Sequence, residues 1–144
     1  GYSSRGTEVQ AASGCAELTD WPSNIAARQR NAFLLREGLR GLPLEVPQYP
    51  VKDSAWMMFP ILSKQREALC LHLEANGVET RPLLPLTSQP YVRKLWNTLT
   101  WRDIDDTLPV AARVNREGFY VGCHQHLSVG DIAYMVEVFR RFYE

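Results

Sequence analysis

Apolar residues recur every three or four positions at the start of the chain, which is the spacing of an amphipathic helix. Residues 7–18 form the first such stretch. Pro22 stands where a second helix is expected to begin, because proline is favoured in the first helical turn. Gly41 and Pro43 carry the signals that end this second helix. We therefore predict two helices within residues 1–41.

A strand, a helix and a second strand are expected next. Residues 42–50 contain three prolines and form an extended connector. Residues 55–62 are continuously apolar, and Pro60 among them disfavours both a helix and a central strand of a sheet. This β-α-β order favours a layered α/β fold. The expected elements are a strand at 55–62, a helix at 64–76 capped by Ser63 and ended by Gly77, and a strand at 78–84.

The rest of the chain alternates between irregular and regular patterns. Residues 85–106 mix turn-forming and aromatic residues, and a loop of this length in a compact domain is often a lid or a binding loop. Thr107 is predicted to begin a short helix that Gly118 ends, and a strand is expected at 119–123. Ser128 opens a capping box before the clearest amphipathic helix of the chain. These elements amount to a small α/β sandwich with a long entry helix.

The composition is that of one globular domain. The chain has 144 residues, with 16 Lys+Arg against 16 Asp+Glu, and 45% of its residues are hydrophobic. We expect no nucleic-acid partner because the net charge is zero, and no membrane span because no apolar run approaches roughly 20 residues. The start lacks both a signal peptide and an initiator methionine, so we expect it to lie inside a longer protein. Cys15, Cys70 and Cys123 are scattered without disulfide or metal spacing, which favours a reducing, cytoplasmic location.

Two places carry side chains that suit a binding site. Arg81 ends a predicted strand just before the irregular region, where a guanidinium suits a phosphate or carboxylate, and an ordinary surface ion pair fits equally well. Cys123, His124 and His126 form a cluster of soft ligands, but no third or fourth metal ligand is identifiable, and a solvated strand end is the simpler interpretation. No nucleophile-and-base motif is present, so no catalytic residue is predicted.

Aromatic and acidic residues give weaker signals. Any member of an aromatic set could stack on a base or a sugar ring, while most members are expected to fill the core or an interface. The acidic run at 103–106 is interpreted as solvated, since no ligand pattern for a divalent ion accompanies it. The aromatic set is Trp56, Tyr91, Trp96, Trp101 and Tyr120, and the acidic residues are Asp103, Asp105 and Asp106.

Five blocks, spread over nearly the whole chain, match one known family in the correct order. Residues 1–12 resemble a G-Y-N-x-R-x-[TS]-[DE]-x-Q-A-A segment, and residues 28–31 resemble an Arg-x-x-Asn helix. Residues 55–61 resemble a small-domain strand, 77–82 a Gly-Val-x-Thr-Arg turn, and 118–131 a closing strand and C-terminal helix. The family is DegT/DnrJ/EryC1/StrS, whose members are pyridoxal-phosphate (PLP) aminotransferases and related dehydrases acting on nucleotide-linked keto-sugars.

The resemblance implies the C-terminal domain of a fold-type I PLP-dependent transferase, a small sheet covered by helices with a long entry helix. Residues 1–41 would be a helical segment linking to a missing large PLP-binding domain, and residues 42–144 the small C-terminal α/β domain. In the family, the lysine that holds the cofactor covalently lies in the large domain in a Ser-x-x-Lys context. None of Lys52, Lys64 and Lys94 has a serine three residues earlier, so none fits that role.

The resemblance also implies site residues and partners. The family's Gly-Tyr-Asn asparagine reaches the cofactor phosphate of the other subunit of a homodimer. Ser3 takes that position here, or Ser4 if the segment shifts by one, and Arg5 matches the family's arginine. We therefore predict Ser3 and Arg5 as cofactor-binding residues, and Arg81 and Tyr91 as substrate-binding residues.

These expectations favour a fragment of an aminotransferase for nucleotide-linked keto-sugars, as used in cell-surface polysaccharide or antibiotic sugar biosynthesis. The fragment would supply cleft and dimer-interface residues and would be inactive alone, without its own PLP lysine. A fragment of a dehydrase is one alternative, because the residue that decides between the two reactions lies in the absent domain. A non-catalytic binding module, whose entry helix seeks a partner, is another. A metal-dependent enzyme at Cys123, His124 and His126 is a third.

Overall fold

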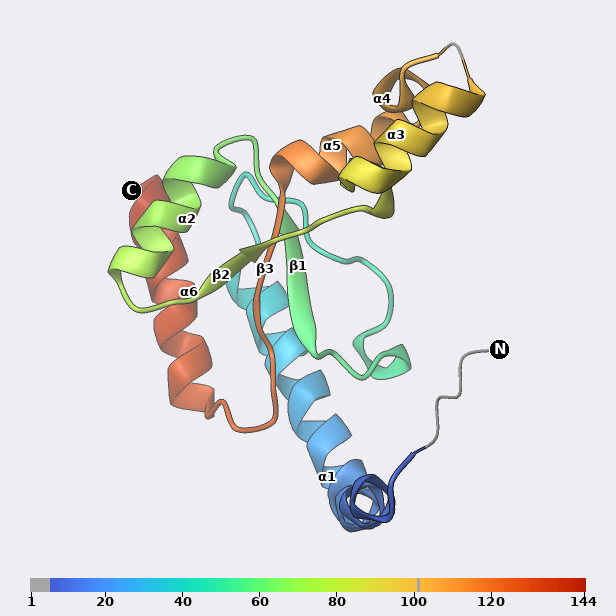
Figure 1. Cartoon of the computed structure of the whole chain (residues 1–144). Helices are drawn as coiled ribbons and strands as arrows, with labels where there is room; N and C mark the ends of the chain where they lie inside the picture. The colour runs from blue at the N-terminus through green and yellow to red at the C-terminus, as the bar shows by residue number, and fades with distance from the viewer. Residues whose placement is uncertain (1–5, 101) are drawn as a thin grey trace.

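Three short antiparallel strands form the centre of the computed structural model, which describes residues 6–100 and 102–144. The strands are β1 (Met58–Leu62), β2 (Thr80–Pro82) and β3 (Gly118–Gly122), and β3 lies between the other two (Figure 1). Helix α2 (Arg66–Ala75) joins β1 to β2, as the predicted β-α-β order requires. Strands β1 and β2 each pair with β3 and not with each other. A strand from much later in the chain therefore lies between the two strands of the β-α-β unit.

The entry segment is one helix, α1 (Glu8–Gly38), and the predicted break before Pro22 is wrong. A capping box starts it, in which the Thr7 hydroxyl accepts from the Gln10 amide and the Gln10 side chain accepts from the Thr7 amide. Pro22 removes one hydrogen bond from the helix interior, and the ladder continues on both sides. Figure 1 shows the first part of α1 nearly end-on and the rest lengthwise, so the helix bends instead of ending.

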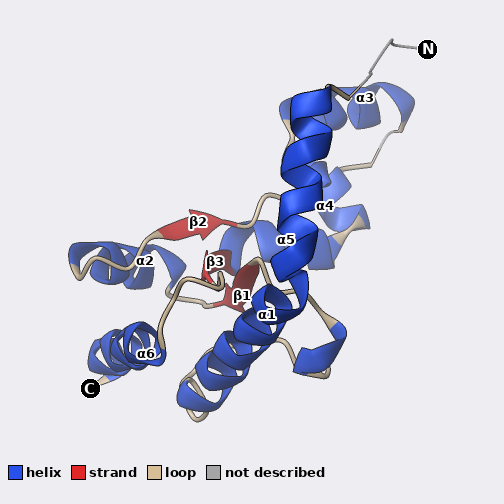
Figure 2. Cartoon of the chain, turned by 90° about the horizontal axis from the view of Figure 1, so that it is seen from below, coloured by secondary structure: helices blue, strands red, loops and turns tan. Residues whose placement is uncertain are grey.

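The core lies between one face of the sheet and three helices. The C-terminal half of α1 packs against α6 (Val129–Tyr143), which in turn packs against α2. Figure 2 shows α6, α2 and this half of α1 on the same side of the strands. The buried residues are Phe59 and Ile61 of β1, Phe119 and Val121 of β3, Ala32, Leu35 and Leu39 from α1 and its end, Leu69 and Leu73 of α2, and Ile132, Met135, Val138 and Phe139 of α6.

The opposite face of the sheet is not covered by α2, by α6 or by the C-terminal half of α1. Because side chains alternate along a strand, Met58, Arg81 and Tyr120 point to this open face while their neighbours enter the core. The N-terminal half of α1 and a helical arm, residues 83–117, both project toward this side (Figure 2). The open face is therefore flanked by two projections at its two ends.

The arm contains more helix than the sequence pattern suggested. The irregular region expected at 85–106 instead forms η2 (Leu86–Ser88), α3 (Pro90–Leu99) and α4 (Ile104–Thr107). Pro90 begins α3 and Asp103 caps α4, so residues that also favour loops act here as helix-start signals. The helix expected from Thr107 is α5 (Pro109–Glu117), which begins two residues later because Thr107 ends α4.

Other boundaries differ by one or two residues. Helix α2 begins at Arg66. Just before this helix, the Ser63 hydroxyl accepts a hydrogen bond from the Gln65 amide. After the helix, Gly77 adopts a left-handed backbone conformation with φ +76°, which ends the helical turn. Strand β2 is shorter than the predicted 78–84, and Pro60 lies in an edge strand as expected. A short η1 (Val51–Asp53) precedes β1. In residues 6–100 and 102–144, no helix combines the length and the apolar character needed to cross a membrane.

Candidate functional site

An open groove lies where β2 and β3 meet the start of α6. Its volume is about 590 Å³, which is within the range of small-molecule sites. Two glycines, Gly77 and Gly122, remove side chains from its walls. The other lining residues are Val78, Glu79, Arg81, Tyr120, His124, Leu127, Asp131, Tyr134 and Met135.

Arg81 is held in place at this groove by its neighbours. It is the cross-strand partner of Tyr120, so both side chains lie on the open face of the sheet. Its Nη2 and Nε donate to Oε1 of Glu79 at 2.7 and 3.0 Å. The hydrogen bond that Arg81 donates to Glu79 is the main reason that the pKa of Arg81 is raised. The guanidinium is thus charged and paired with Glu79, and both side chains are mostly exposed.

The loop that carries His124 is anchored to α1 by a buried polar network. The Asn31 side chain is fully buried, and its Nδ2 donates to the carbonyls of His124 at 2.9 Å and Leu127 at 3.3 Å. Arg30 donates to the Asn31 Oδ1 and to the same Leu127 carbonyl. Arg28 adds a bond from Nε to the Gln125 Oε1 at 2.9 Å. Sequence reasoning found these α1 residues only through the family resemblance, which gave them no role.

The start of α6 forms the far wall of the groove. Ser128 and Asp131 make the predicted capping box, with Ser128 N donating to Asp131 Oδ2 at 2.8 Å and Asp131 N donating to Ser128 Oγ at 3.1 Å. The hydrogen bond from the Ser128 amide is the largest of the causes that lower the pKa of the Asp131 carboxyl. Tyr134 Oη donates to the Asn76 carbonyl at 3.0 Å, which fixes its ring beside the groove. The Asp131 carboxylate and the Tyr134 hydroxyl are therefore already hydrogen-bonded within the chain.

The two predicted substrate-binding residues do not share one site. Arg81 lines the groove, whereas Tyr91 lies in the first turn of α3 on the arm, with 75% of its side chain exposed. Ser3 and Arg5, the predicted cofactor-binding residues, lie outside the described residues, as does Trp101 of the aromatic set. The roles of all four residues in the two predicted sites remain predictions.

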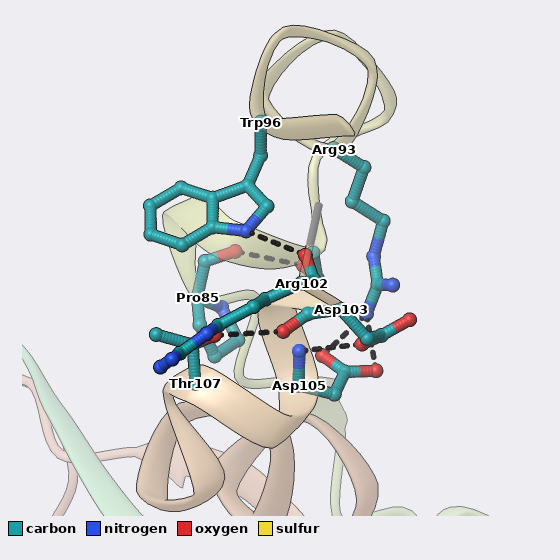
Figure 3. Close-up of polar contacts among 8 residues, drawn as sticks. Pro85, Arg93, Trp96, Arg102, Asp103, Asp105 and Thr107 are labelled. Carbon is teal, nitrogen blue, oxygen red and sulfur yellow. Dashed lines mark hydrogen bonds and ion pairs between the residues drawn. The ribbon is translucent and has the colours of Figure 1, made fainter. Parts of the chain in front are cut away.

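Two of the acidic residues of the arm, Asp103 and Asp105, make contacts that hold its helices, whereas Asp106 is exposed. Arg93 Nη2 contacts both carboxylate oxygens of Asp105, at 2.6 and 2.7 Å (Figure 3). Asp103 caps α4 by accepting from the Asp105 amide at 2.7 Å. Trp96 Nε1 donates to the Arg102 carbonyl at 3.1 Å, across the short connection between α3 and α4. These bonds tie α3 to α4, so the arm is an ordered helical unit.

The cysteine–histidine cluster does not gather its side chains for a metal. Cys123 is buried and its Sγ donates to the Arg28 carbonyl at 3.6 Å, and burial raises the pKa of its thiol to about 12. The rings of His124 and His126 are 6.0 Å apart between centroids, outside the buried core. Within the described ranges, no three His, Cys, Asp or Glu side chains are grouped as metal ligands. The cluster is therefore the end of a strand, and the thiol of Cys123 faces the core.

Comparisons with known proteins agree over almost the whole chain. The sequence model of the DegT/DnrJ/EryC1/StrS aminotransferase family matches residues 1–140. The chain is 29% identical over 153 residues to the lipopolysaccharide biosynthesis protein RfbH of Salmonella typhimurium, covering 99% of this chain and 34% of that protein. It is 32% identical over 151 residues to the dTDP-4-dehydro-2,6-dideoxy-D-glucose 3-dehydratase of Saccharopolyspora spinosa, covering 99% and 32%. It is 26% identical over 147 residues to the GDP-4-keto-6-deoxy-D-mannose 3-dehydratase of Escherichia coli, covering 97% and 37%. The chain thus spans about a third of the length of these relatives.

Solved structures share the fold. S. venezuelae DesV, in complex with a ketimine intermediate, superposes with a TM-score of 0.82 at 24% identity, covering 100% of this chain and 40% of that one. The E. coli GDP-4-keto-6-deoxy-D-mannose 3-dehydratase with bound hydrated PLP gives a TM-score of 0.77 at 26% identity, covering 96% and 36%. The small sheet with its helical layer is therefore a recurring part of longer chains.

Proposed function

Because this chain belongs to the DegT/DnrJ/EryC1/StrS aminotransferase family, we propose that it is the C-terminal portion of a PLP-dependent enzyme acting on nucleotide-linked keto-sugars. The proposal depends on how much of this chain and how much of each relative the comparisons cover. The family match runs over residues 1–140 of this chain, yet the chain spans only 32% to 37% of its curated relatives. The remainder of those proteins would supply the larger part of the active site.

The exposed apolar residues support a docking role for the open side of the molecule. Val9 near the start of α1 is 79% exposed, and Leu99 on the arm is 71% exposed. Large exposed apolar surfaces of soluble proteins usually mark contact sites. In the proposed enzyme, the large domain packs on the open face of the sheet between the two projections. Met58 is exposed on the open face of β1, and the other exposed apolar residues on the two projections are Leu18, Trp21, Leu84, Leu86, Tyr91, Leu95, Leu108 and Val110.

The lysines of this chain do not fit the covalent attachment of PLP. Covalent catalysis by a lysine needs an amine whose pKa is lowered in a closed pocket. Lys52, Lys64 and Lys94 are all exposed, and they lie on η1, ahead of α2 and on α3 respectively. The amine that holds PLP therefore comes from the other part of the proposed enzyme, and no chemical step is assigned to this chain.

The share of this chain in the proposed enzyme is to bind and orient. Ser3 and Arg5 contact the cofactor phosphate across a homodimer interface, as the family resemblance implies. Arg81, which lines the groove, contacts an anionic group of the substrate. Tyr91, which is exposed on the arm, contacts the substrate from there. These side chains fix the substrate's position while the large domain supplies the reactive amine.

Dehydration is a second candidate for the reaction, and the relatives favour it. The Saccharopolyspora spinosa and E. coli relatives are both named as 3-dehydratases of nucleotide-linked keto-sugars. Amino transfer is the reaction in the name of the family. Both reactions use PLP to withdraw electrons from a carbon next to nitrogen, so this chain's residues suit either.

The experiment that tests the function uses the natural protein read from the gene that encodes this chain. That protein is incubated with PLP, glutamate and a GDP- or dTDP-linked 4-keto-6-deoxy sugar, and the products are identified by mass spectrometry. We expect either an amino sugar or a sugar that has lost water. A natural protein that binds PLP and converts neither class of sugar would contradict the proposal. The 144-residue chain alone is the matched control and should convert nothing.

A further inference from the structure

A second cavity lies at the opposite end of the sheet from the groove. The groove is lined by Gly122 at the end of β3, whereas Leu62 and Glu117, which line the cavity, stand at the end of β1 and just before β3. Helix α6 begins at the groove and reaches the cavity at Tyr143. The volume of the cavity is about 580 Å³, which is within the range of small-molecule sites. The cavity is therefore a separate hollow to which the proposed function assigns no ligand.

The walls of this cavity are held together by hydrogen bonds between distant segments. The amides of Glu45, in the connector, and Leu62 donate to each other's carbonyls, at 3.0 and 2.9 Å. The Ser63 amide donates to the Glu117 carbonyl at 3.0 Å, and the Ser63 side chain is buried. The Tyr143 hydroxyl lies 3.4 Å from Ser63 Oγ, so the end of α6 joins the same wall. These contacts fix the shape of the cavity.

The carboxylates that line the cavity share one guanidinium. Arg113 donates from Nε to Glu117 Oε2 at 2.9 Å and from Nη2 to Glu45 Oε1. The hydrogen bond from Arg113 is the main reason that the pKa of Glu45 is lowered, so its carboxylate is ionised at neutral pH. No donor among the described residues reaches Glu45 Oε2, which can accept from an ammonium group. Two carboxylates against one guanidinium leave this side of the cavity negative.

Lys64 gives the cavity a positive side. Its charge adds to the lowering of the pKa of Glu45, yet its ammonium makes no ion pair with any residue in the described ranges. The side-chain amide of Gln65 beside it is likewise without a partner there. An ammonium and an amide are the donors that a carboxylate takes. The lining charges balance as a whole but stand apart, so a molecule with one charge of each sign matches them better than a simple anion or cation does.

We propose that this cavity binds a small zwitterion, namely an α-amino acid with an apolar side chain. Lys64 and Gln65 bind its carboxylate, and Glu45 accepts from its ammonium group. The side chain of the amino acid lies on the apolar part of the wall, which consists of Leu42, Leu44 and Leu62. The inference goes beyond the proposed function, because no predicted cofactor-binding or substrate-binding residue lines this cavity.

The test is a titration of the 144-residue chain with L-leucine, followed by amide chemical shifts in NMR. No PLP is present, so leucine cannot react as an amino donor. We expect saturable shifts centred on Leu44, Gln65 and Glu117. The analogue without the ammonium group, 4-methylpentanoate, and the analogue without the carboxylate, 3-methylbutylamine, should each bind about tenfold more weakly. The absence of saturable shifts with leucine, shifts centred elsewhere, or equal affinity for either analogue would overturn the proposal.

Substitutions assign the two charged ends of the cavity. Lys64→Gln should weaken leucine binding about tenfold and leave the binding of 3-methylbutylamine unchanged, because that amine has no carboxylate. Glu45→Gln should weaken the binding of leucine and of 3-methylbutylamine without weakening that of 4-methylpentanoate. Lys52→Gln, at an exposed position of η1 outside the cavity, is the matched control and should bind all three ligands as the wild type does.

This selective pattern separates lost contacts from lost structure. A misfolded variant would lose all three ligands together, whereas each variant in the cavity is expected to lose only the ligands that carry one charged group. If Lys64→Gln bound leucine as tightly as the wild type, or weakened all three ligands by the same factor, the assignment of the two ends would be wrong.

Discussion

The buried amide of Asn31 on α1 donates a 2.9 Å hydrogen bond to the main-chain carbonyl of His124, at the far end of the chain. This bond joins the entry helix to the loop after β3 across 93 residues of sequence. A buried amide in this position satisfies two main-chain carbonyls of the loop, and the loop keeps one shape as a result. The position of the His124 ring in the groove therefore depends on a residue that does not line it.

Replacing Asn31 should test this connection. Asn31→Asp keeps the size of the side chain but puts oxygen where Nδ2 donates, so the His124 carbonyl loses this donor and the Leu127 carbonyl keeps only the one from Arg30. We expect a loss of about 2 kcal/mol or more in the free energy of unfolding, measured with urea. The matched control, Asn97→Asp on an exposed face of α3, should change stability by less than about 0.5 kcal/mol. If both variants were equally stable, the network would not hold the loop.

The capping box of α6 should make stability depend on acid. The Ser128 bonds lower the pKa of Asp131 in the folded chain below its ordinary 3.8. A lowered pKa means that the ionised carboxylate stabilises the fold above the ordinary value, and that this contribution is lost as the pH falls through the folded value. The melting temperature of Asp131→Ala should therefore lie below that of the wild type at neutral pH, and the difference should shrink in strong acid.

A carboxylate outside any cap provides the comparison for that pH effect. Asp106→Asn, which removes a carboxylate from an exposed position of α4, is the matched control for the loss of a surface charge. An Asp131→Ala difference that stays constant from neutral to strongly acidic pH would show that the cap does not depend on the ionised carboxylate.

The cysteines should differ in reactivity with thiol reagents. Burial raises the pKa of Cys123 to about 12, and its thiol bonds to the Arg28 carbonyl beneath the loop. Because the thiolate is the reactive form, Cys123 should resist an alkylating reagent near neutral pH until the chain unfolds. Cys15 on the exposed part of α1 should be modified first, and peptide mass spectrometry would follow each site. Rapid modification of Cys123 in the folded Cys15→Ser variant would contradict its placement.

The Arg93–Asp105 ion pair should hold the arm without affecting the core. Arg93→Gln removes the contact to both carboxylate oxygens and leaves the sheet untouched. We expect faster hydrogen exchange of the α3 and α4 amides, with unchanged exchange in β3 and α6. Arg102→Gln, which removes an exposed charge from the same arm, is the control. Equal exchange in both variants would show that other contacts order the arm.

The sequence was sufficient where local signals and burial agreed. The capping box at Ser128 and Asp131, the glycine stop at Gly77 and the edge-strand position of Pro60 were all predicted and are confirmed. Each depends on a few neighbouring residues, so a single sequence contains the information.

The sequence was insufficient where distant residues decide the structure. Pro22 is a helix-start signal by itself, but the rest of α1 continues the ladder through it. The sequence of the arm is typical of a loop, because the contact between Arg93 and Asp105 that joins α3 to α4 cannot be inferred from the sequence pattern. The groove was missed for the same reason. Arg81 stood out as a charged strand end, whereas its alignment with Tyr120 and His124 follows from a pairing between strands far apart in the chain.

The origin of the reactive amine is the central claim, and covalent trapping tests it most directly. The natural protein and the 144-residue chain are each mixed with one equivalent of PLP, reduced with borohydride and digested, and the labelled peptide is identified by mass spectrometry. We predict stoichiometric labelling of one lysine of the natural protein outside this chain, and only weak, uneven surface labelling of the isolated chain. Stoichiometric labelling of Lys52, Lys64 or Lys94, abolished by replacing that lysine with arginine, would contradict the account.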